Sequence, residues 1–210
     1  IVLNAHAINR GRMPQFTAGG DFEFLEMPDE ETAARRIVAL CREELPREGF
    51  NALEDVQVLS PMHRTPCGVD NLNRLLQAAL NPPAPEKAEF RNSTLTLRVG
   101  DKVMQTKNDY TKGVFNGDIG FIREVSADGV KVRYSEELTA DYEPNELMML
   151  TLAYAMSVHK SQGSEYPVIV LPLVAAHHIM LQRNLLYTAV TRAKKKVVLL
   201  GSKAAVFTAV

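Results

Sequence analysis

The spacing of hydrophobic and polar residues changes twice along the chain. Up to about residue 83, apolar residues recur at helical spacing or form the short buried runs typical of strands. This pattern predicts helices over residues 1–10, 28–45 and 69–80, and strands over 21–27 and 56–59. Gly11 and Pro82-Pro83 stand where helices are expected to end. Residues 1–10 resemble the end of a helix, so we expect a segment upstream of them.

The residue pattern changes from Ala84 to about Leu150. Short segments in which apolar and polar residues alternate replace the helical period. Five strands are predicted, over residues 94–99, 102–105, 118–125, 130–134 and 147–151. Asp128-Gly129 suits a two-residue hairpin turn between the third and fourth strands. Five short strands in about 60 residues indicate a small all-β barrel.

The α/β alternation resumes after the barrel, with a strand at 168–173, a helix at 181–193 and a strand at 197–200. Strands followed by covering helices favour an α/β fold with a mostly parallel sheet. Ligands are then expected at the carboxyl ends of its strands. The barrel is therefore predicted to interrupt a single α/β domain.

The most polar loop of this domain runs from Met156 to Tyr166, with the sequence MSVHKSQGSEY, and a β-branched strand follows it directly. Small residues at a turn and nearby cations suit a loop that presents backbone N–H groups to a phosphate. The charge distribution agrees, because residues 151–210 contain seven Lys or Arg and one acid, Glu165. With a net charge of −1 for the whole chain, this asymmetry indicates an anionic partner at one end. Lys194-Lys195-Lys196 alone could equally be a solvated helix end.

Composition places the chain among ordinary globular proteins, with 46% hydrophobic and 23% charged residues in 210. It lacks both a long apolar run and a signal-peptide pattern, so we expect a cytoplasmic protein without membrane contact. Cys41 and Cys67 fit neither a disulfide framework nor a metal-ligand spacing. His177-His178 could suggest a metal, but adjacent histidines diverge and a third ligand is missing, so we expect no metal and a solvated connection there.

Two stretches resemble a known family, VHKSQGSEYPVIVL from Val158 and LLYTAVTRAKK from Leu185. They are similar to motifs V and VI of superfamily 1 helicases, in particular the RecD-like branch. The resemblance implies a RecA-like parallel sheet flanked by helices, with an inserted all-β SH3-like barrel. It divides the chain into 1–87 and 151–210 for the RecA-like domain and 88–150 for the barrel. Two other segments support the resemblance but are less specific, Gly100-Asp101-Lys102 and Asn116-Gly117-Asp118.

The same resemblance implies a nucleotide site. Arg192 matches the motif VI arginine that reaches the γ-phosphate, and is the expected catalytic residue. A planar guanidinium neutralises charge on a transferred phosphoryl group better than a mobile ammonium does. Gly163, Ser164 and Glu165 match the motif V residues near the phosphate and sugar. The alternatives are an exposed helix-end arginine, a turn glycine and a surface acid.

A DNA site is implied as well. Ser157, His159, Lys160 and Ser161 match positions that touch the backbone of single-stranded DNA, where hydroxyls and cations bind phosphate without reading sequence. Arg64 and Thr65 follow a predicted strand end, where the family has another contact. His159 could instead be a hydrogen-bonded structural histidine, and the roles of Arg64 and Thr65 remain open.

A phosphate loop and an acidic strand end, which an ATPase requires, are missing from this sequence. Asp29-Glu30 fits the first turn of a helix better than a magnesium site. ATP and Mg²⁺ are therefore expected to be held mainly by a preceding N-terminal RecA-like domain, and the 210 residues alone should be inactive.

Within that family, the expected function is that of an ATP-dependent helicase moving 5′ to 3′. Its partners would be single-stranded DNA and a duplex junction. The alternatives are the helicase subunit of a multi-subunit exonuclease, a non-catalytic single-strand-binding module, and an interaction domain that binds no nucleic acid.

Overall fold

A five-stranded parallel sheet organises the first of two units in the computed structural model, which describes residues 1–210. This α/β unit comprises Ile1–Leu76 and Ala155–Val210. Its strands, in the spatial order β1-β12-β11-β2-β10, are Phe22–Glu26, Ala193–Gly201, Tyr166–Leu173, Val56–Ser60 and Ala155–Ser157. All adjacent pairs are parallel. The central strands β11 and β2 are buried almost throughout, as expected for a parallel sheet covered on both faces.

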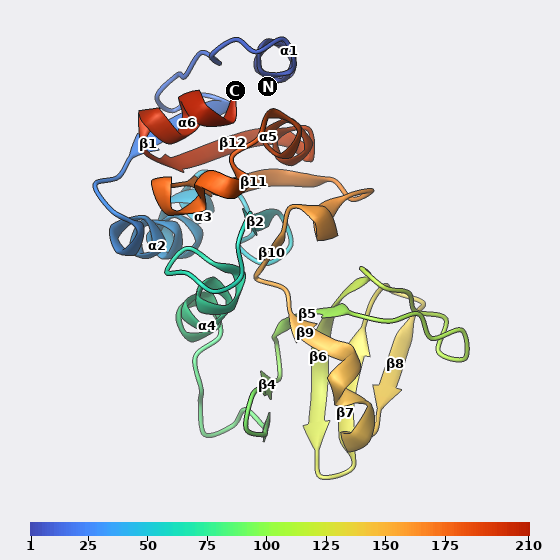
Figure 1. Ribbon diagram of the computed structural model, residues 1–210. Helices are drawn as coiled ribbons and strands as arrows, with labels where there is room; N and C mark the ends of the chain where they lie inside the picture. Colours follow the sequence, from blue (N-terminus) through green and yellow to red (C-terminus); the bar gives the residue numbers. More distant parts are fainter. The chain divides into compact units, whose positions relative to one another are not determined.

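The helices are α1 (Val2–Asn9), α2 (Glu30–Ala39), α3 (Leu45–Arg47), α4 (Val69–Leu80), α5 (Arg183–Val190) and α6 (Lys203–Ala209), shown in Figure 1. The predicted helix 69–80 is confirmed to the residue. Asp29 caps α2, accepting a hydrogen bond of 2.6 Å from the Thr32 N–H, so its reading as a helix-opening acid is confirmed. The helix expected over 28–45 continues from α2 through a π-helical turn, Leu40–Glu44, into α3.

The end of α5 and the start of β12 differ from the prediction. The helix ends at Val190 rather than Ala193, because the Thr191 hydroxyl bonds the Tyr187 carbonyl and the chain then pairs with β11. Lys194-Lys195-Lys196 is therefore strand, and its reading as a solvated helix end is wrong. Lys196 is buried, with its Nζ 2.6 Å from a Glu48 oxygen and 3.3 Å from a Glu23 oxygen. Two carboxylates offset the burial of this ammonium group.

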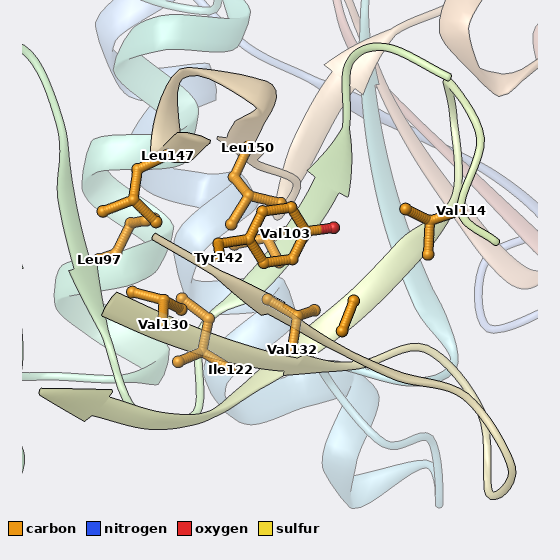
Figure 2. Packing of buried hydrophobic residues seen from close by; sticks show 10 residues of the cluster. Leu97, Val103, Val114, Ile122, Val130, Val132, Tyr142, Leu147 and Leu150 are labelled. Atoms are coloured by element: carbon orange, nitrogen blue, oxygen red, sulfur yellow. The ribbon is translucent and has the colours of Figure 1, made fainter. Parts of the chain in front are cut away.

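The second unit, Gln77–Tyr154, contains a five-stranded antiparallel sheet in the order β8-β7-β6-β5-β9. These strands are Thr139–Tyr142, Gly129–Arg133, Ile119–Ser126, Lys102–Gln105 and Leu150–Leu152. A separate hairpin joins β3 (Glu89–Arg91) to β4 (Thr96–Arg98). Apolar side chains from these strands form one core around Val103, Ile122 and Val132 (Figure 2). The expected all-β barrel is thus present, and we call this part the barrel unit.

Three details of the barrel unit depart from the sequence pattern. Ser126 pairs with Gly129, so the hairpin turn is Ala127-Asp128, one residue earlier than expected. The start of the strand expected at 147–151 is instead a 3-10 helix, Pro144–Met149, because Glu143 and Glu146 form a capping box around Pro144. Strands β3 and β8 were not predicted, since three or four residues give too little alternation.

Asp101 joins the first and last residues of the barrel unit. Its carboxylate, fully buried, accepts hydrogen bonds from Gln77 (2.7 Å), Asn81 (2.8 Å) and the Tyr154 hydroxyl (2.7 Å), and from one backbone N–H (2.8 Å). The end of α4 is therefore part of this unit's hydrogen-bonded structure. We call this arrangement the Asp101 cluster.

Candidate nucleotide and DNA sites

The residues expected to bind nucleotide lie together at the amino ends of two neighbouring strands. Gly163, Ser164 and Glu165 directly precede β11, and Arg192 directly precedes β12. The Tyr166 N–H donates to the Arg192 carbonyl at 2.8 Å, which holds the two segments side by side. The general expectation that ligands lie at carboxyl ends of strands therefore does not apply to this group.

Arg192 has few partners for its half-buried guanidinium. Its Nη1 is 3.5 Å from the Ser164 carbonyl, at the outer limit of a hydrogen bond, and its buried Nε has no partner. A guanidinium carries five N–H donors, and a buried donor without an acceptor costs about 1–3 kcal/mol. An anion beside Arg192 would satisfy these donors.

The loop before β11 leaves space for such an anion. Gly163 has a φ of +85°, which favours glycine, and a Cβ added there would meet no heavy atom within 4 Å. Glycine is thus favoured here by the backbone conformation and not by a lack of space, because the space around it is open. The Glu165 carboxylate lies 2.9 Å from Lys194 Nζ, and the resulting ion pair lowers the pKa of Glu165. Both side chains are exposed, so this pair contributes little to stability.

The residues expected to touch DNA follow the carboxyl ends of β10 and β2. Ser157 ends β10 and pairs in register with Ser60, which ends β2. His159 and Lys160 are exposed on the 3-10 turn His159–Ser161. Ser161 is buried and donates its hydroxyl proton to the Val158 carbonyl at 2.6 Å. Its hydroxyl shapes the turn, whereas His159 and Lys160 project outward.

Arg64 and Thr65 belong to the loop after β2, residues 61–68. Arg64 is exposed and makes no ion pair. Thr65 is half-buried, and its Oγ1 lies 3.1 Å from His177 Nε2. The loop is tightly closed, since the Ser60 hydroxyl donates to the Cys67 carbonyl at 2.6 Å and a Cβ at Gly68 would overlap the His63 carbonyl. Arg64 therefore projects from a well-held turn.

The sequence pattern did not predict the burial of His177 or its polar contacts. His177 is fully buried, so its expected place in a solvated connection is wrong, whereas His178 is exposed. Its Nε2 is 3.1 Å from both Thr65 Oγ1 and Glu30 Oε1. Burial lowers the pKa of His177, which favours the neutral ring. The one available signal was its position just after the buried strand β11.

Glu30 extends this contact to a third element. One of its carboxylate oxygens also accepts the Cys67 N–H at 3.1 Å. The Cys67 thiol donates to the Glu30 carbonyl, and burial raises the pKa of this thiol to about 12. Cys67 is thus a buried, protonated thiol, and not a nucleophile. Glu30, Thr65 and His177 form one group at the carboxyl ends of β1, β2 and β11, which we call the His177 cluster.

A cavity of about 320 Å³ lies between the turn after β10 and helix α5. It is lined by Val158, His159, Gln162, Met180, Gln182, Asn184, Leu185 and Thr188. Thr188, one turn before Arg192, is the member closest in sequence to the expected catalytic residue. The structure contains no helix long and apolar enough to cross a membrane.

Comparison with known proteins gives two family matches. Residues 72–140 match the SH3 domain of ATP-dependent RecD-like DNA helicases, and residues 152–200 match the C-terminal domain of UvrD-like helicases. The first match covers most of α4 and most of the barrel unit. The second contains every expected nucleotide residue and the DNA-contact residues after β10.

Curated relatives agree with these matches. The ATP-dependent RecD2 DNA helicase of Deinococcus radiodurans is 39% identical over 212 residues, covering 98% of this chain and 27% of the relative. The RecBCD enzyme subunit RecD of Mycolicibacterium smegmatis is 32% identical over 164 residues, covering 78% and 28%. The chain thus spans about a quarter of the length of these relatives.

Solved structures show the same fold at low sequence identity. The Pif1 helicase from Candida albicans matches with a TM-score of 0.56 at 18% identity, covering 95% of this chain and 52% of that one. A Bacteroides Pif1 helicase in complex with ADP-AlF3 and single-stranded DNA matches with a TM-score of 0.53 at 18% identity, covering 94% and 48%.

Proposed function

Because this chain belongs to the RecD-like branch of the superfamily 1 helicases and corresponds to their C-terminal portion, we propose that it serves an ATP-dependent DNA helicase. In this proposal the intact protein moves 5′ to 3′ on single-stranded DNA and couples ATP hydrolysis to duplex unwinding. A preceding RecA-like domain supplies the phosphate loop and the Mg²⁺ ligands.

The under-partnered guanidinium of Arg192, beside the open loop at Gly163, is the observation that carries the proposal. When bound, ATP supplies the phosphoryl group whose transfer to water drives the motor. Arg192 directs its N–H donors at the γ-phosphate and offsets the negative charge there. Gly163 and Ser164 allow the backbone to come close to the phosphates, and Glu165 lies toward the sugar.

The DNA contacts come from the other ends of the strands. Lys160, His159 and Arg64 are exposed and bind backbone phosphates of a single strand, with the Ser157 and Thr65 hydroxyls nearby. Such contacts position the strand and do not read its sequence. Ser161 contributes by holding the turn, since its hydroxyl bonds Val158. The loop 158–165, which joins β10 to β11, contains residues of both groups, so it can couple the state of the nucleotide to the binding of DNA.

The relationship to RecD subunits of RecBCD enzymes favours a second candidate, a helicase subunit of a multi-subunit nuclease. The higher identity and wider coverage with the Deinococcus radiodurans helicase favour the first. Gel filtration of the intact protein from its native source would separate them. A helicase acting alone elutes without nuclease subunits.

The decisive experiment replaces Arg192 in the intact protein. Arg192→Ala should lower the rate of DNA-stimulated ATP hydrolysis by about 10³–10⁵, the range known for arginine fingers, with little change in nucleotide affinity. Arg192→Lys should recover little of the rate, because lysine lacks the planar fork. DNA binding without nucleotide should survive both changes.

Lys195→Ala is the matched control, since Lys195 is an exposed cation of the same segment. It should hydrolyse ATP at the parent rate. A well-folded Arg192→Ala protein with near-normal hydrolysis would return Arg192 to a structural role and contradict the proposal.

A further inference from the structure

The loop between β5 and β6, residues 106–118, exposes two aromatic rings. Tyr110 is 80% exposed and Phe115 is 44% exposed. Their ring centroids are 5.8 Å apart with planes at 75°, an edge-to-face pair. Exposed aromatic residues that contact each other still leave ring faces open to solvent, where apolar area would gain from burial. We call residues 106–118 the aromatic loop.

Hydrogen bonds fix the conformation of the aromatic loop. Asp109 and Val114 exchange two backbone bonds, of 2.7 and 3.1 Å. The Asp109 carboxylate accepts the N–H groups of Thr111 and Lys112 at 3.0 Å each, and the Asp118 carboxylate accepts the Phe115 N–H at 2.8 Å. Val114 is buried in the core of the barrel unit, as Figure 2 shows. The backbone that carries the two rings is therefore ordered before any partner arrives, which lowers the entropy cost of binding.

The charges of the aromatic loop favour an anionic partner with flat groups. Both of its carboxylates, Asp109 and Asp118, are turned onto backbone N–H groups. Lys112 is bound to Glu146 at 2.7 Å, whereas Lys107 is exposed and makes no ion pair. The outward surface thus offers two rings and one unpaired cation without a free acid. A nucleotide, with its flat base and its phosphate, matches this combination.

We propose that Tyr110 and Phe115 form a stacking platform for unpaired bases of single-stranded DNA, with Lys107 near a phosphate of the same strand. The proposal rests on the proposed function as a helicase. Aromatic stacking tolerates any base, because every base has a π face. The platform therefore suits a protein that moves along DNA of any sequence.

The test measures single-strand affinity of the intact protein by anisotropy of a labelled oligo-dT. Tyr110→Ala combined with Phe115→Ala should weaken binding about 5- to 100-fold, the range for losing base stacking. The slope of log affinity against log salt should stay unchanged, because no phosphate contact is lost. Lys107→Ala should instead reduce that slope by about 0.7, the value for one phosphate of a single strand.

Two further variants separate stacking from folding. Tyr110→Trp should preserve affinity, and in the 210 residues, which contain no other tryptophan, its fluorescence should change on adding oligo-dT. Phe207→Ala removes the aromatic ring of a residue in α6 that is 74% exposed, and this variant should bind as the parent does. All variants should melt within a few degrees of the parent.

The outcomes are distinct. A parent protein that binds no single-stranded DNA contradicts the proposed function itself. A parent that binds DNA, together with an equally tight Tyr110→Ala/Phe115→Ala variant, overturns the platform alone and leaves the proposed function standing. Weaker binding with a reduced salt slope also overturns it, since the rings would then be acting through phosphate contacts.

Discussion

A buried imidazole holds an exposed loop in the His177 cluster. His177 Nε2 contacts Thr65, whose neighbour Arg64 is an expected DNA contact. Glu30 accepts from the same nitrogen and also holds the Cys67 N–H at the far end of the loop. The neutral ring, favoured by its lowered pKa, fits this arrangement as an N–H donor. We infer that His177 positions the 61–68 loop and does not itself touch DNA.

This role predicts coupling between His177 and Thr65 in DNA binding. His177→Gln and Thr65→Val should each weaken single-strand affinity of the intact protein by about 3- to 10-fold, the effect of losing one hydrogen bond. The double variant should be no weaker than the worse single variant, because the same contact is lost. A double-mutant cycle on the dissociation constants measures this coupling.

His178→Ala is the matched control, since His178 is the exposed neighbour and should leave affinity unchanged. Strictly additive losses at His177 and Thr65 would show that the two side chains act separately, and would remove the positioning role.

At the scale of single elements, the Asp101 cluster makes a stability prediction. Asp101→Ala would remove one acceptor each from the Gln77 amide, the Asn81 amide and the Tyr154 hydroxyl. The two amides would keep their bonds to the Thr96 and Val99 carbonyls. The free energy of unfolding of the barrel unit should fall by about 3–5 kcal/mol, because several neutral hydrogen-bond donors lose their buried acceptor and each unsatisfied one costs about 1–3 kcal/mol. Urea denaturation of the 210-residue chain measures the change.

Asp141→Ala offers the comparison, because Asp141 is an exposed acid on β8 of the same unit. Its effect should stay within about 0.5 kcal/mol. If Asp101→Ala unfolds no more easily than Asp141→Ala, the cluster does not stabilise the unit.

Elements with strong local signals could be predicted from sequence, and those set by distant partners could not. Helix α4 has its apolar face and its terminal prolines within one segment, so its bounds follow from the pattern. The first residues of β12 are polar, and they become strand because β11 and two remote glutamates accommodate them. His177 is similar, since its partners Glu30 and Thr65 are distant in sequence. The motif residues were found by resemblance, and their functions remain proposals.

At the scale of the whole molecule, the barrel unit should serve strand handling more than ATP chemistry. None of the expected nucleotide residues belongs to it. In the intact protein, replacing residues 82–153 with a short Gly/Ser linker should leave most DNA-stimulated ATP hydrolysis in place and strongly reduce unwinding of a tailed duplex. Parallel hydrolysis and strand-displacement assays measure the two activities.

Circular dichroism of the shortened protein must show that the parallel sheet remains folded. Given that control, an equal loss of hydrolysis and unwinding would count against this division of labour.

The Asp101 cluster also has a consequence for the order of folding. Strand β2 is complete long before β10, its partner at the edge of the sheet, is synthesised. A long segment of chain separates β2 from β10. Bringing its two ends together is slow and entropically costly, because a chain forms its local contacts first. A barrel unit that folds early brings Gln77 and Tyr154 onto one carboxylate, and Asn73 then bonds both backbone groups of Ala155 at 2.8 and 2.9 Å. We infer that the insert shortens the search by which the surrounding sheet completes its edge, so that on the ribosome the barrel unit folds before the domain that contains it.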